Sequence, residues 1–255
     1  MRRFVIFVVL VVTLVAVFQL SRIADNWHYI VPVEPGKLVY AASFDGVSDD
    51  WEYYEGRLSA QIENSVIRLG VAVDDDGLYS SASPYFDDFD IQVTSQLKDG
   101  VFDGNNNNGY GIVFRQKDRE NYYLFLVSSD GSYRIKRVLD NTSKILSEWI
   151  FTDAIHKVPG AINRLRVVGY KDRFQFFIND EQMEVCVPEN PDGISTFDLE
   201  GNCMGLMQDT LVDDAISFGR VGVAVETDRG QFDPVVVDFD NVVIFGPQPI
   251  DEPTR

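Results

Sequence analysis

The sequence predicts an all-β protein, an antiparallel two-sheet jelly-roll sandwich with an N-terminal transmembrane helix. After residue 38 the chain is a succession of short apolar or alternating runs. Asp-, Gly- and Asn-rich turns separate these runs, as tight hairpins require. No amphipathic helical pattern competes with them, since 208–217 would form at most one or two helical turns. The only long apolar stretch, Phe4–Leu20, precedes the domain.

The N-terminal apolar stretch has the polarity and length of a membrane span. At about 1.5 Å per residue, Phe4–Leu20 nearly crosses a hydrocarbon core of about 30 Å. No pair of small residues in an A-x-A arrangement follows it, which favours an uncleaved anchor and leaves a cleaved signal peptide as the alternative. Arg2 and Arg3 place the N-terminus in the cytoplasm. We therefore expect a single-pass protein of the cell membrane with an extracytoplasmic domain.

Turn residues divide the rest of the chain. Residues 1–24 contain the basic end and the transmembrane signal anchor, and 25–37 form a linker with prolines and a glycine. Residues 38–246 form the sandwich domain, and 247–255 a polar tail. Aromatic residues make up 13% of the chain, enough for the sizeable core of one large β domain.

The strands of the domain follow from the apolar runs. We expect them at 38–44, 65–73, 89–97, 109–116, 121–128, 132–139, 144–151, 163–170, 173–178, 181–187, 220–226 and 234–245. The hairpin at 109–127 is apolar on both faces. We expect one set of its side chains to fill the space between the sheets: Ile112, Phe114, Tyr122, Leu124 and Leu126. The opposite set would lie under a ligand or under long loops: Val113, Tyr123, Phe125 and Val127.

The charge and the histidine content exclude several classes of function. The formal net charge of -18 repels phosphate backbones, so we expect no nucleic-acid partner. His28 and His156 are the only histidines, which argues against a His-rich zinc site and a Ser-His-Asp hydrolase. The acidic balance fits a soluble exposed domain, a cation-rich partner or divalent metals.

Cys186 and Cys203 are the only cysteines, and they flank a Pro- and Gly-rich loop. Outside the cytoplasm a disulfide is the natural state of such a pair, while free thiols and a metal site are the alternatives. Closing a loop of this size contributes about 3 kcal/mol in the chain-entropy model.

A series of short motifs carries a family resemblance. They are "SFDG" and "DW" within 43–51, "GYGIVFR" at 109–115, "NYYLF" at 121–125, "DGSYRI" at 130–135, "NRLRV" at 163–167, "FFIND" at 176–180, "GRVGVAVE" at 219–226 and "FDNVVI" at 239–244. In this order they resemble the concanavalin A-like lectin/glucanase jelly roll. More narrowly they resemble the laminin-G-like and 3-keto-disaccharide hydrolase-type domains of bacterial surface proteins.

The resemblance implies a carbohydrate-related or adhesive role. Related glucanases use an E-x-D-x-x-E strand, which is absent here; "DDFDIQVT" at 87–94 lacks the last Glu. We therefore expect a membrane-anchored module that binds a glycan or a cell-surface partner. A hydrolase of the 3-keto-disaccharide hydrolase type and an accessory subunit of a membrane complex are the alternatives.

Sugar rings stack on aromatic side chains, and their hydroxyls bond polar ones. The candidate ligand-binding residues are Trp51, Tyr53, Tyr54, Tyr110, Arg115 and Trp149. No catalytic residue is predicted.

A structural calcium ion is expected where the first and last strands meet. Asp45 and Asp240 lie in matching segments, "FDG" at 44–46 and "FDN" at 239–241. In the last strand Asp238 and Asp240 share one face, and two such carboxylates repel unless they are solvated or bound to a cation. The alternative is that Asp45 and Asp240 only cap turns. The EF-hand pattern fits neither "DDDG" at 74–77 nor "DGNNNNG" at 103–109.

Overall fold

The computed structural model describes residues 11–15, 17, 28–46, 48–99, 108–158, 160–193, 195–230 and 233–251. The chain forms two compact units, Met1–Ile30 and Val31–Arg255. In the first unit, 11–15 and 17 are helical, and no helix within the described residues is long and apolar enough to cross a membrane. The predicted anchor, Phe4–Leu20, lies mostly outside the described residues and stays a prediction.

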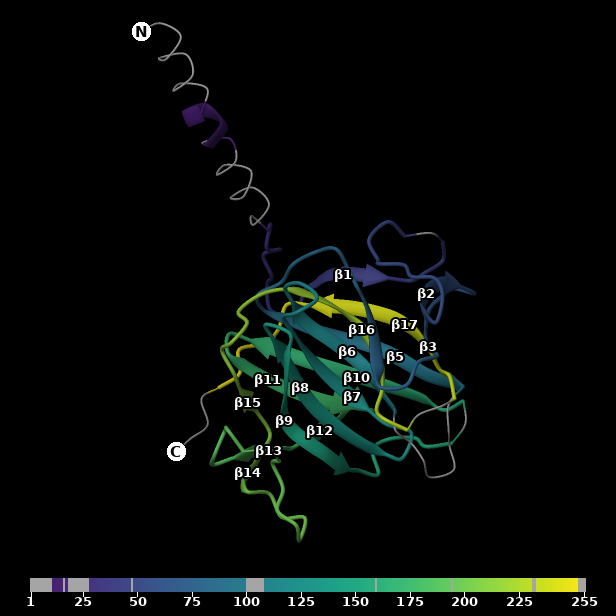
Figure 1. The fold of residues 1–255 in the computed structure, drawn as a ribbon, viewed down its shortest axis with the longest axis vertical. Coiled ribbons are helices and arrows are strands. Elements are labelled where there is room, and N and C mark those ends of the chain that lie inside the picture. Colours follow the sequence, from purple (N-terminus) through teal and green to yellow (C-terminus); the bar gives the residue numbers. More distant parts are fainter. Residues whose placement is uncertain are drawn as a thin grey trace, which may run out of the picture. The chain divides into compact units, whose positions relative to one another are not determined.

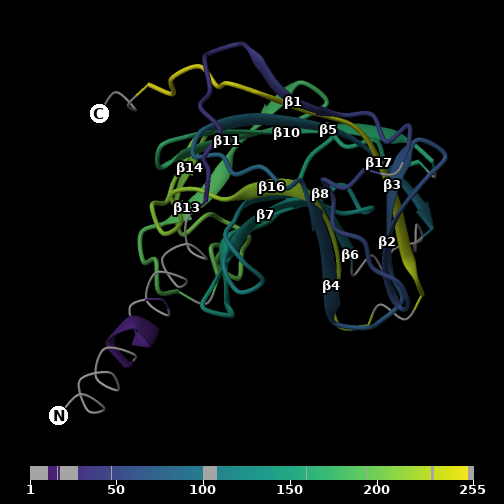
Figure 2. The same cartoon turned by 90° about the horizontal axis from the view of Figure 1, so that it is seen from above.

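The second unit is a sandwich of two antiparallel sheets, and Figure 2 shows the two layers edge on. The larger one, which we call the back sheet, runs β12-β11-β10-β5-β17-β3-β2, with β1 added to β17 and β15 added to β11. Its strands are β1 (Leu38–Ala42), β2 (Leu58–Glu63), β3 (Val66–Val71), β5 (Phe89–Asp99), β10 (Ile162–Tyr170), β11 (Arg173–Ile178), β12 (Glu181–Met183), β15 (Leu211–Val212) and β17 (Val235–Phe245).

The second layer, which we call the front sheet, runs β4-β16-β6-β7-β8-β9. Its strands are β4 (Asp76–Ser81), β6 (Asn108–Gln116), β7 (Tyr122–Val127), β8 (Ser132–Leu139), β9 (Thr142–Phe151) and β16 (Arg220–Thr227). A separate hairpin pairs β13 (Val185–Pro188) with β14 (Gly205–Gln208). Figure 1 shows this hairpin below the sheets. The all-β, two-sheet architecture confirms the predicted fold class for the described part of the domain.

Aromatic rings from both sheets fill the space between them. Phe114 and Tyr123 of the front sheet stack with ring centroids 5.2 Å apart. Phe174 of the back sheet packs against both, at 5.2 Å and 5.4 Å. Phe176 lies 5.0 Å from Phe125. These contacts bury large apolar areas at the favoured centroid distances, and they fix the two sheets face to face.

Burial along the strands shows which sheet faces are covered. In β11 it alternates, because Phe174, Phe176 and Ile178 enter the core while their neighbours meet solvent. Every residue of β6 is buried, which confirms that this strand is covered on both faces. The front sheet therefore has an outer side that is partly shielded from water.

The strand pairing corrects the predicted faces of the 109–127 hairpin. Val113 lies opposite Leu124, and Phe114 lies opposite Tyr123. Ile112 and Phe114 enter the core as expected, but the assignment of β7 was wrong by one residue. Tyr123, Phe125 and Val127 face the core, whereas Tyr122, Leu124 and Leu126 lie on the outer side. A one-residue change of register moves every side chain to the other face, and the turn residues do not fix that register.

Other predicted elements differ in detail. The strand expected at 181–187 is two strands that break at Glu184. The helical turns considered at 208–217 are absent; Leu211 instead pairs with Phe174 in the back sheet. Strands β2, β4, β14 and β15 were not predicted.

Candidate functional site

The outer side of the front sheet gathers aromatic and charged side chains, which we call the front face. Its members are Tyr79, Tyr122, Arg134, Lys136, Trp149 and Glu226. They surround an apolar base formed by Val113, Leu124, Leu126 and Ala224, which are at most 2% exposed. Strand alternation places these residues together, because Tyr79 pairs with Ala224 and Leu126 pairs with Arg134 across neighbouring strands.

An ionic network crosses the front face. One Arg134 nitrogen, Nη2, donates to Glu226 and Asp228, with both contacts at 3.1 Å. Lys136 Nζ donates to the other Glu226 oxygen at 2.6 Å. The side chains of Arg134 and Glu226 are only 7% and 13% exposed. Glu226 is therefore held by two cations in a site that is largely withdrawn from water.

The rings lie beside this network. The Arg134 guanidinium carbon is 4.5 Å from the centre of the Trp149 ring, which is a cation–π contact. Gly109 makes room for the indole, since a Cβ there would lie 3.1 Å from Leu126 and 3.4 Å from Trp149. The rings of Tyr79 and Tyr122 are 5.1 Å apart. A Cβ at Gly109 would require Leu126 to move by a few tenths of an ångström, while the indole would stay at ordinary contact distance.

Several buried polar atoms of this region have no hydrogen-bond partner among the described residues. They include Arg134 Nε, Glu52 Oε2 and Arg220 Nε. Glu52 pairs with Arg220 at 3.0 Å, and its negative charge adds a small contribution to the pKa of Tyr79, which burial raises most. Buried polar groups are normally bonded, so the missing hydrogen bonds of these enclosed atoms lower the stability of this region.

Burial controls the ionisation of the front-face tyrosines. It raises the pKa of Tyr122 to about 12, and the negative charge of Glu226 adds to this effect. Burial likewise raises the pKa of Tyr79, and the nearby Tyr122 contributes. Both hydroxyls are therefore neutral at physiological pH and can donate and accept hydrogen bonds. The described residues contain no group of three or more His, Cys, Asp or Glu that could hold a metal ion.

Trp149 is the one predicted ligand residue that belongs to the front face, and Tyr54 adjoins it. Tyr54 lies near Glu52 and contributes to the raised pKa of Tyr79. Tyr53 is 41% exposed and donates to the Ser48 carbonyl oxygen at 2.6 Å. The structure does not bring Tyr53 into the front-face network.

The other three predicted ligand residues lie in the core, so we leave them out of the site. Trp51 is 4% exposed, packs edge-on against Phe44 and donates its indole N–H to Tyr40 at 2.9 Å. Tyr110 is 3% exposed, and burial raises its pKa to about 12. Neither ring has a face open to a sugar.

Arg115 is buried as a structural cation. Its guanidinium donates to the carbonyl oxygens of Asp87 and Ile216 at 2.9 Å and 2.8 Å, and also to that of Lys171. It also lies 4.7 Å from the centre of the Phe174 ring. Burial lowers its pKa, but these carbonyls solvate the charge. Arg115 therefore joins three distant segments and is not a ligand residue.

The carboxylates of Asp238 and Asp240 are bound by neighbouring protein groups in the structure. Asp240 accepts from the backbone N–H of Asn241 at 2.6 Å and from its amide at 3.0 Å. Asp238 is bound by Arg68 at 2.6 Å and 2.9 Å, so an arginine serves as the cation for that carboxylate. The calcium ion between Asp45 and Asp240 stays a prediction, which calorimetric melting with calcium and with chelator can test.

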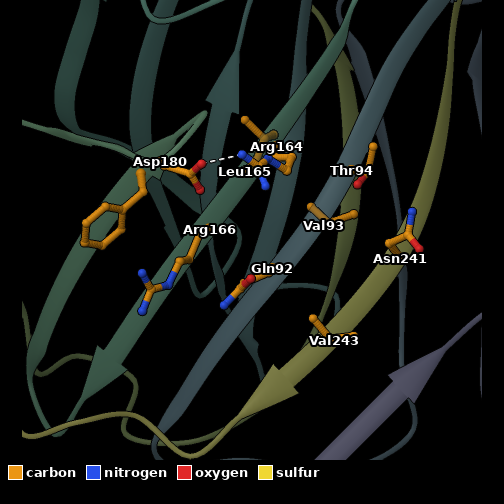
Figure 3. A pocket seen from close by; sticks show the side chains of 10 residues that line it. Gln92, Val93, Thr94, Arg164, Leu165, Arg166, Asp180, Asn241 and Val243 are labelled. Atoms are coloured by element: carbon orange, nitrogen blue, oxygen red, sulfur yellow. Dashed lines mark hydrogen bonds and ion pairs between the residues drawn. The ribbon is translucent and has the colours of Figure 1, made fainter. Parts of the chain in front are cut away.

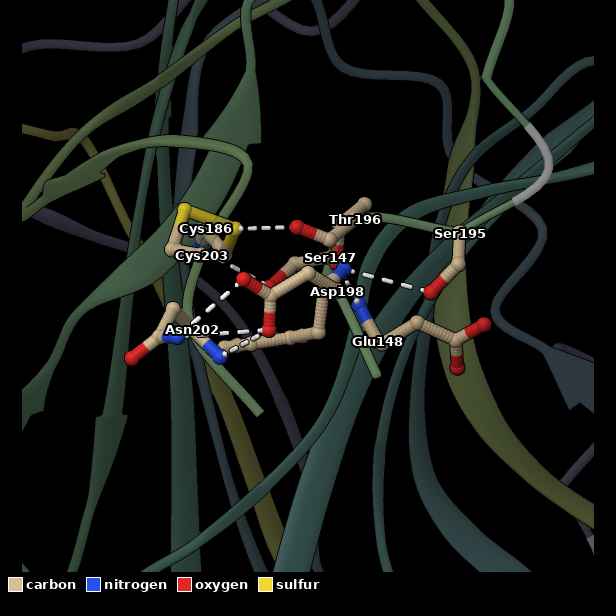
Figure 4. The surroundings of a disulfide bond; sticks show 9 residues. Ser147, Glu148, Cys186, Ser195, Thr196, Asp198, Asn202 and Cys203 are labelled. Atoms are coloured by element: carbon tan, nitrogen blue, oxygen red, sulfur yellow. Dashed lines mark hydrogen bonds between the residues drawn. A yellow bond between two sulfur atoms is a disulfide. The ribbon is translucent and has the colours of Figure 1, made fainter. Parts of the chain in front are cut away.

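The predicted disulfide is confirmed. Cys186 and Cys203 are bonded, with Cα atoms 5.6 Å apart (Figure 4). Two hydroxyls fix the loop to β9: Ser147 Oγ accepts from the Cys186 N–H, and Thr196 Oγ1 accepts from the Glu148 N–H, both at 3.0 Å. The bond therefore closes a loop that is already attached to the front sheet.

Sequence reasoning missed Tyr79, Tyr122, Arg134, Lys136 and Glu226. Arg134 and Lys136 alternate within a hydrophobic strand, a pattern that places two cations on one face. That signal was available in the sequence. Their partner Glu226 lies in a strand 90 residues away from Lys136, a pairing that no local pattern reveals.

Comparisons with known proteins support the fold. No family model matches the chain, and no curated protein matches it. The carbohydrate binding module CBM66 from Bacillus subtilis aligns with a TM-score of 0.52 and 18% identity, over 77% of this chain and 96% of the module. A Bacillus licheniformis β-glucanase aligns with a TM-score of 0.50 and 7% identity, over 83% and 99%.

A xylan β-1,4-xylosidase from Bacillus halodurans aligns with a TM-score of 0.52 and 13% identity, over 84% of this chain. This chain covers only 41% of that enzyme. Identities this low show the fold alone, because the same sandwich supports many functions. The domain has the concanavalin A-like β-sandwich fold.

Proposed function

We propose that this protein is a membrane-anchored, extracytoplasmic module that binds glycans through its front face. The observation that carries the proposal is the convergence of three aromatic rings with a buried Arg134–Lys136–Glu226 network on one side of one sheet. Aromatic rings accept the C–H faces of sugars, and fixed charged groups bond their hydroxyls.

Two further features support this proposal. A carbohydrate binding module and glycoside-acting enzymes share the fold, so it is suited to presenting such a surface. The disulfide fits an oxidising compartment, and the apolar stretch Phe4–Leu20 fits an anchor that leads there. A cell-surface protein is the alternative partner.

The ion pairs of the acidic side chains favour glycan binding over glycoside hydrolysis as the function of the front face. Hydrolysis of a glycoside commonly needs two carboxyl groups that face the sugar. Glu226 and Asp228 are both held by Arg134, and Glu226 also by Lys136. A hydrolase of the 3-keto-disaccharide hydrolase type remains the alternative that an activity assay on such disaccharides would detect.

A glycan array tests the proposal directly. The full-length chain is applied in a detergent that has no sugar head group, beside Trp149→Ala and the matched control Tyr170→Ala, which removes a ring from the back sheet. We expect the unaltered chain and the control to bind the same glycans. Trp149→Ala should bind about tenfold more weakly, a change of about 1.4 kcal/mol. Equal binding by both variants, or binding of no glycan, would contradict the proposal.

A further inference from the structure

A groove lies on the opposite surface of the sandwich. It crosses β11, β10, β5 and β17 on the outer side of the back sheet and has a volume of about 250 Å³ (Figure 3). We call it the back groove; the side chains that matter for its chemistry are Gln92, Thr94, Arg164, Arg166, Phe177 and Asn241. None of them belongs to the front face.

Strand register assembles this groove from residues far apart in the sequence. Arg166 pairs with Gln92 on one side and with Phe177 on the other. Two residues earlier, Arg164 pairs with Thr94 on the same sheet face. One row across the strands therefore contains the Phe177 ring, the Arg166 guanidinium and the Gln92 amide. The neighbouring row contains the Arg164 guanidinium and the Thr94 hydroxyl.

A bulge in β17 adds one more polar group. Asp240 pairs with Thr94 but Val243 pairs with Gln92, so β17 contains one extra residue at this point. Asn241 lies in the bulge with φ of 52°, a left-handed conformation that asparagine tolerates better than most residues. Figure 3 shows its amide at the edge of the groove, opposite the arginines. Bulges redirect side chains in this way beside binding sites.

Arg166 is held ready for a ligand. Asp90 accepts from its Nε and Nη2, both at 2.7 Å, and the guanidinium carbon lies 4.8 Å from the centre of the Phe177 ring. Since Asp90 binds only that edge of the fork, the N–H groups of Nη1 point away from the carboxylate. A ligand hydroxyl can therefore be bound without reorganisation of the arginine.

The charges indicate which ligand the groove accepts. Arg166 is balanced by Asp90, and Arg164 is paired with Asp180, so the groove has no net charge. The whole chain carries -18, which opposes an anionic ligand. Gln92, Thr94 and Asn241 offer both donors and acceptors, while Phe177 and Val243 supply apolar surface. This combination matches the alternating hydroxyls and C–H groups of a neutral sugar.

We propose that the back groove is a second, independent binding site for a short segment of a neutral saccharide. Its volume lies just below the range of about 300–1,000 Å³ of sites for drug-sized ligands, which suits one or two sugar rings. The proposal shares its ligand class with the front face but not its residues. Variants on the two surfaces therefore separate the failure of one site from the failure of the other.

NMR of the side-chain amides provides the test. The isotope-labelled full-length chain, in a detergent without a sugar head group, is titrated with cellotetraose, xylotetraose and laminaritetraose, and separately with tetragalacturonate. We expect at least one neutral tetrasaccharide to shift the side-chain amide signals of Gln92 and Asn241. Tetragalacturonate should not shift them.

Three variants complete the design. Thr94→Val removes one hydroxyl at nearly constant volume, and Asn241→Gly removes the amide while allowing the positive φ of the bulge. Each should raise the dissociation constant measured at the Gln92 signal about tenfold, whereas Trp149→Ala should leave it unchanged. The proposal is overturned if no neutral probe shifts both amide signals, if only tetragalacturonate does, or if Trp149→Ala abolishes the shifts.

Discussion

The two outer surfaces of the sandwich contain the same trio of groups in different surroundings. On the front face Arg134 lies over Trp149 and binds Glu226; on the back sheet Arg166 lies over Phe177 and binds Asp90. The cation-to-ring distances are 4.5 Å and 4.8 Å. The arginines differ in exposure, with 7% of the Arg134 side chain accessible and 40% of the Arg166 side chain.

This difference in burial changes what the trio does. A buried ion pair has lost its hydration, so the loss of one partner leaves an uncompensated charge and is costly. An exposed ion pair is screened by water and contributes little to stability. The Arg134 pair of the front face is therefore expected to stabilise the fold, and the half-exposed Arg166 still covers the buried Asp90, whereas the exposed Arg164–Asp180 pair of the back groove is expected to contribute little.

The largest expected effect is a difference in the free energy of unfolding when an arginine is removed from each surface. Arg134→Met should lower the free energy of unfolding by about 3 kcal/mol, because Glu226 and Asp228 lose their shared donor. Arg164→Met, which removes the exposed Arg164–Asp180 pair of the back groove, should change it by less than about 1 kcal/mol. Urea denaturation followed by tryptophan fluorescence measures both. Equal losses would show that burial does not distinguish the surfaces.

A methyl group at Gly109 should have the next largest effect. Gly109→Ala places a Cβ 3.1 Å from Leu126 and 3.4 Å from Trp149, and overpacking of this kind costs about 1–3 kcal/mol. Denaturation should show the loss, which arises from the displacement of Leu126. The control is Gly46→Ala, where nothing lies within 4 Å of the new Cβ. A Gly109→Ala protein as stable as Gly46→Ala would contradict the packing of the front face.

Alkaline pH should weaken the front face through Tyr122. Its pKa is raised from 10.0 to about 12, so the folded protein retains the phenolic proton that the unfolded chain loses. This stabilisation is complete below pH 10 and disappears as the pH rises to about 12. Denaturation midpoints measured across that range should fall less steeply for Tyr122→Phe. An identical slope would mean that Tyr122 does not titrate as a buried group.

The smallest effect is expected in the back groove. Thr94→Val should change the free energy of unfolding by less than about 0.5 kcal/mol, since valine suits a strand and the hydroxyl faces the groove. Thermal melting of this variant beside the unaltered chain measures it. A loss above about 1 kcal/mol would indicate that the groove is a structural feature, and its weaker saccharide binding would then have another explanation.

Most strands could be predicted from the sequence because their apolar alternation is local. The ranges 132–139 and 173–178 agree with β8 and β11 residue for residue. β2 and β4 were missed because "LSAQIE" and "DGLYSS" contain too many polar or turn-forming residues for a strand pattern. Their partners in the sheets override these weak local preferences.

The candidate site was less accessible to sequence reasoning. The candidate ligand residues were chosen from the sequence mainly because they are aromatic. In the structure Trp51 and Tyr110 are buried in the core, whereas Trp149 is only partly buried on the front face. The front face and the back groove both depend on pairing between distant strands, as for Arg166 and Gln92. The bulge at Asn241 also depends on register, which the residues of β17 do not determine alone.

The disulfide has a consequence for the resistance of the protein to proteases. The loop that it closes is largely exposed, with Leu199 fully accessible, so a protease can reach its backbone. A single cut between Cys186 and Cys203 leaves both fragments covalently joined, and every strand from β1 to β13 remains linked to β14 to β17. The nicked protein would migrate as one species until it is reduced, and it would retain both sheets.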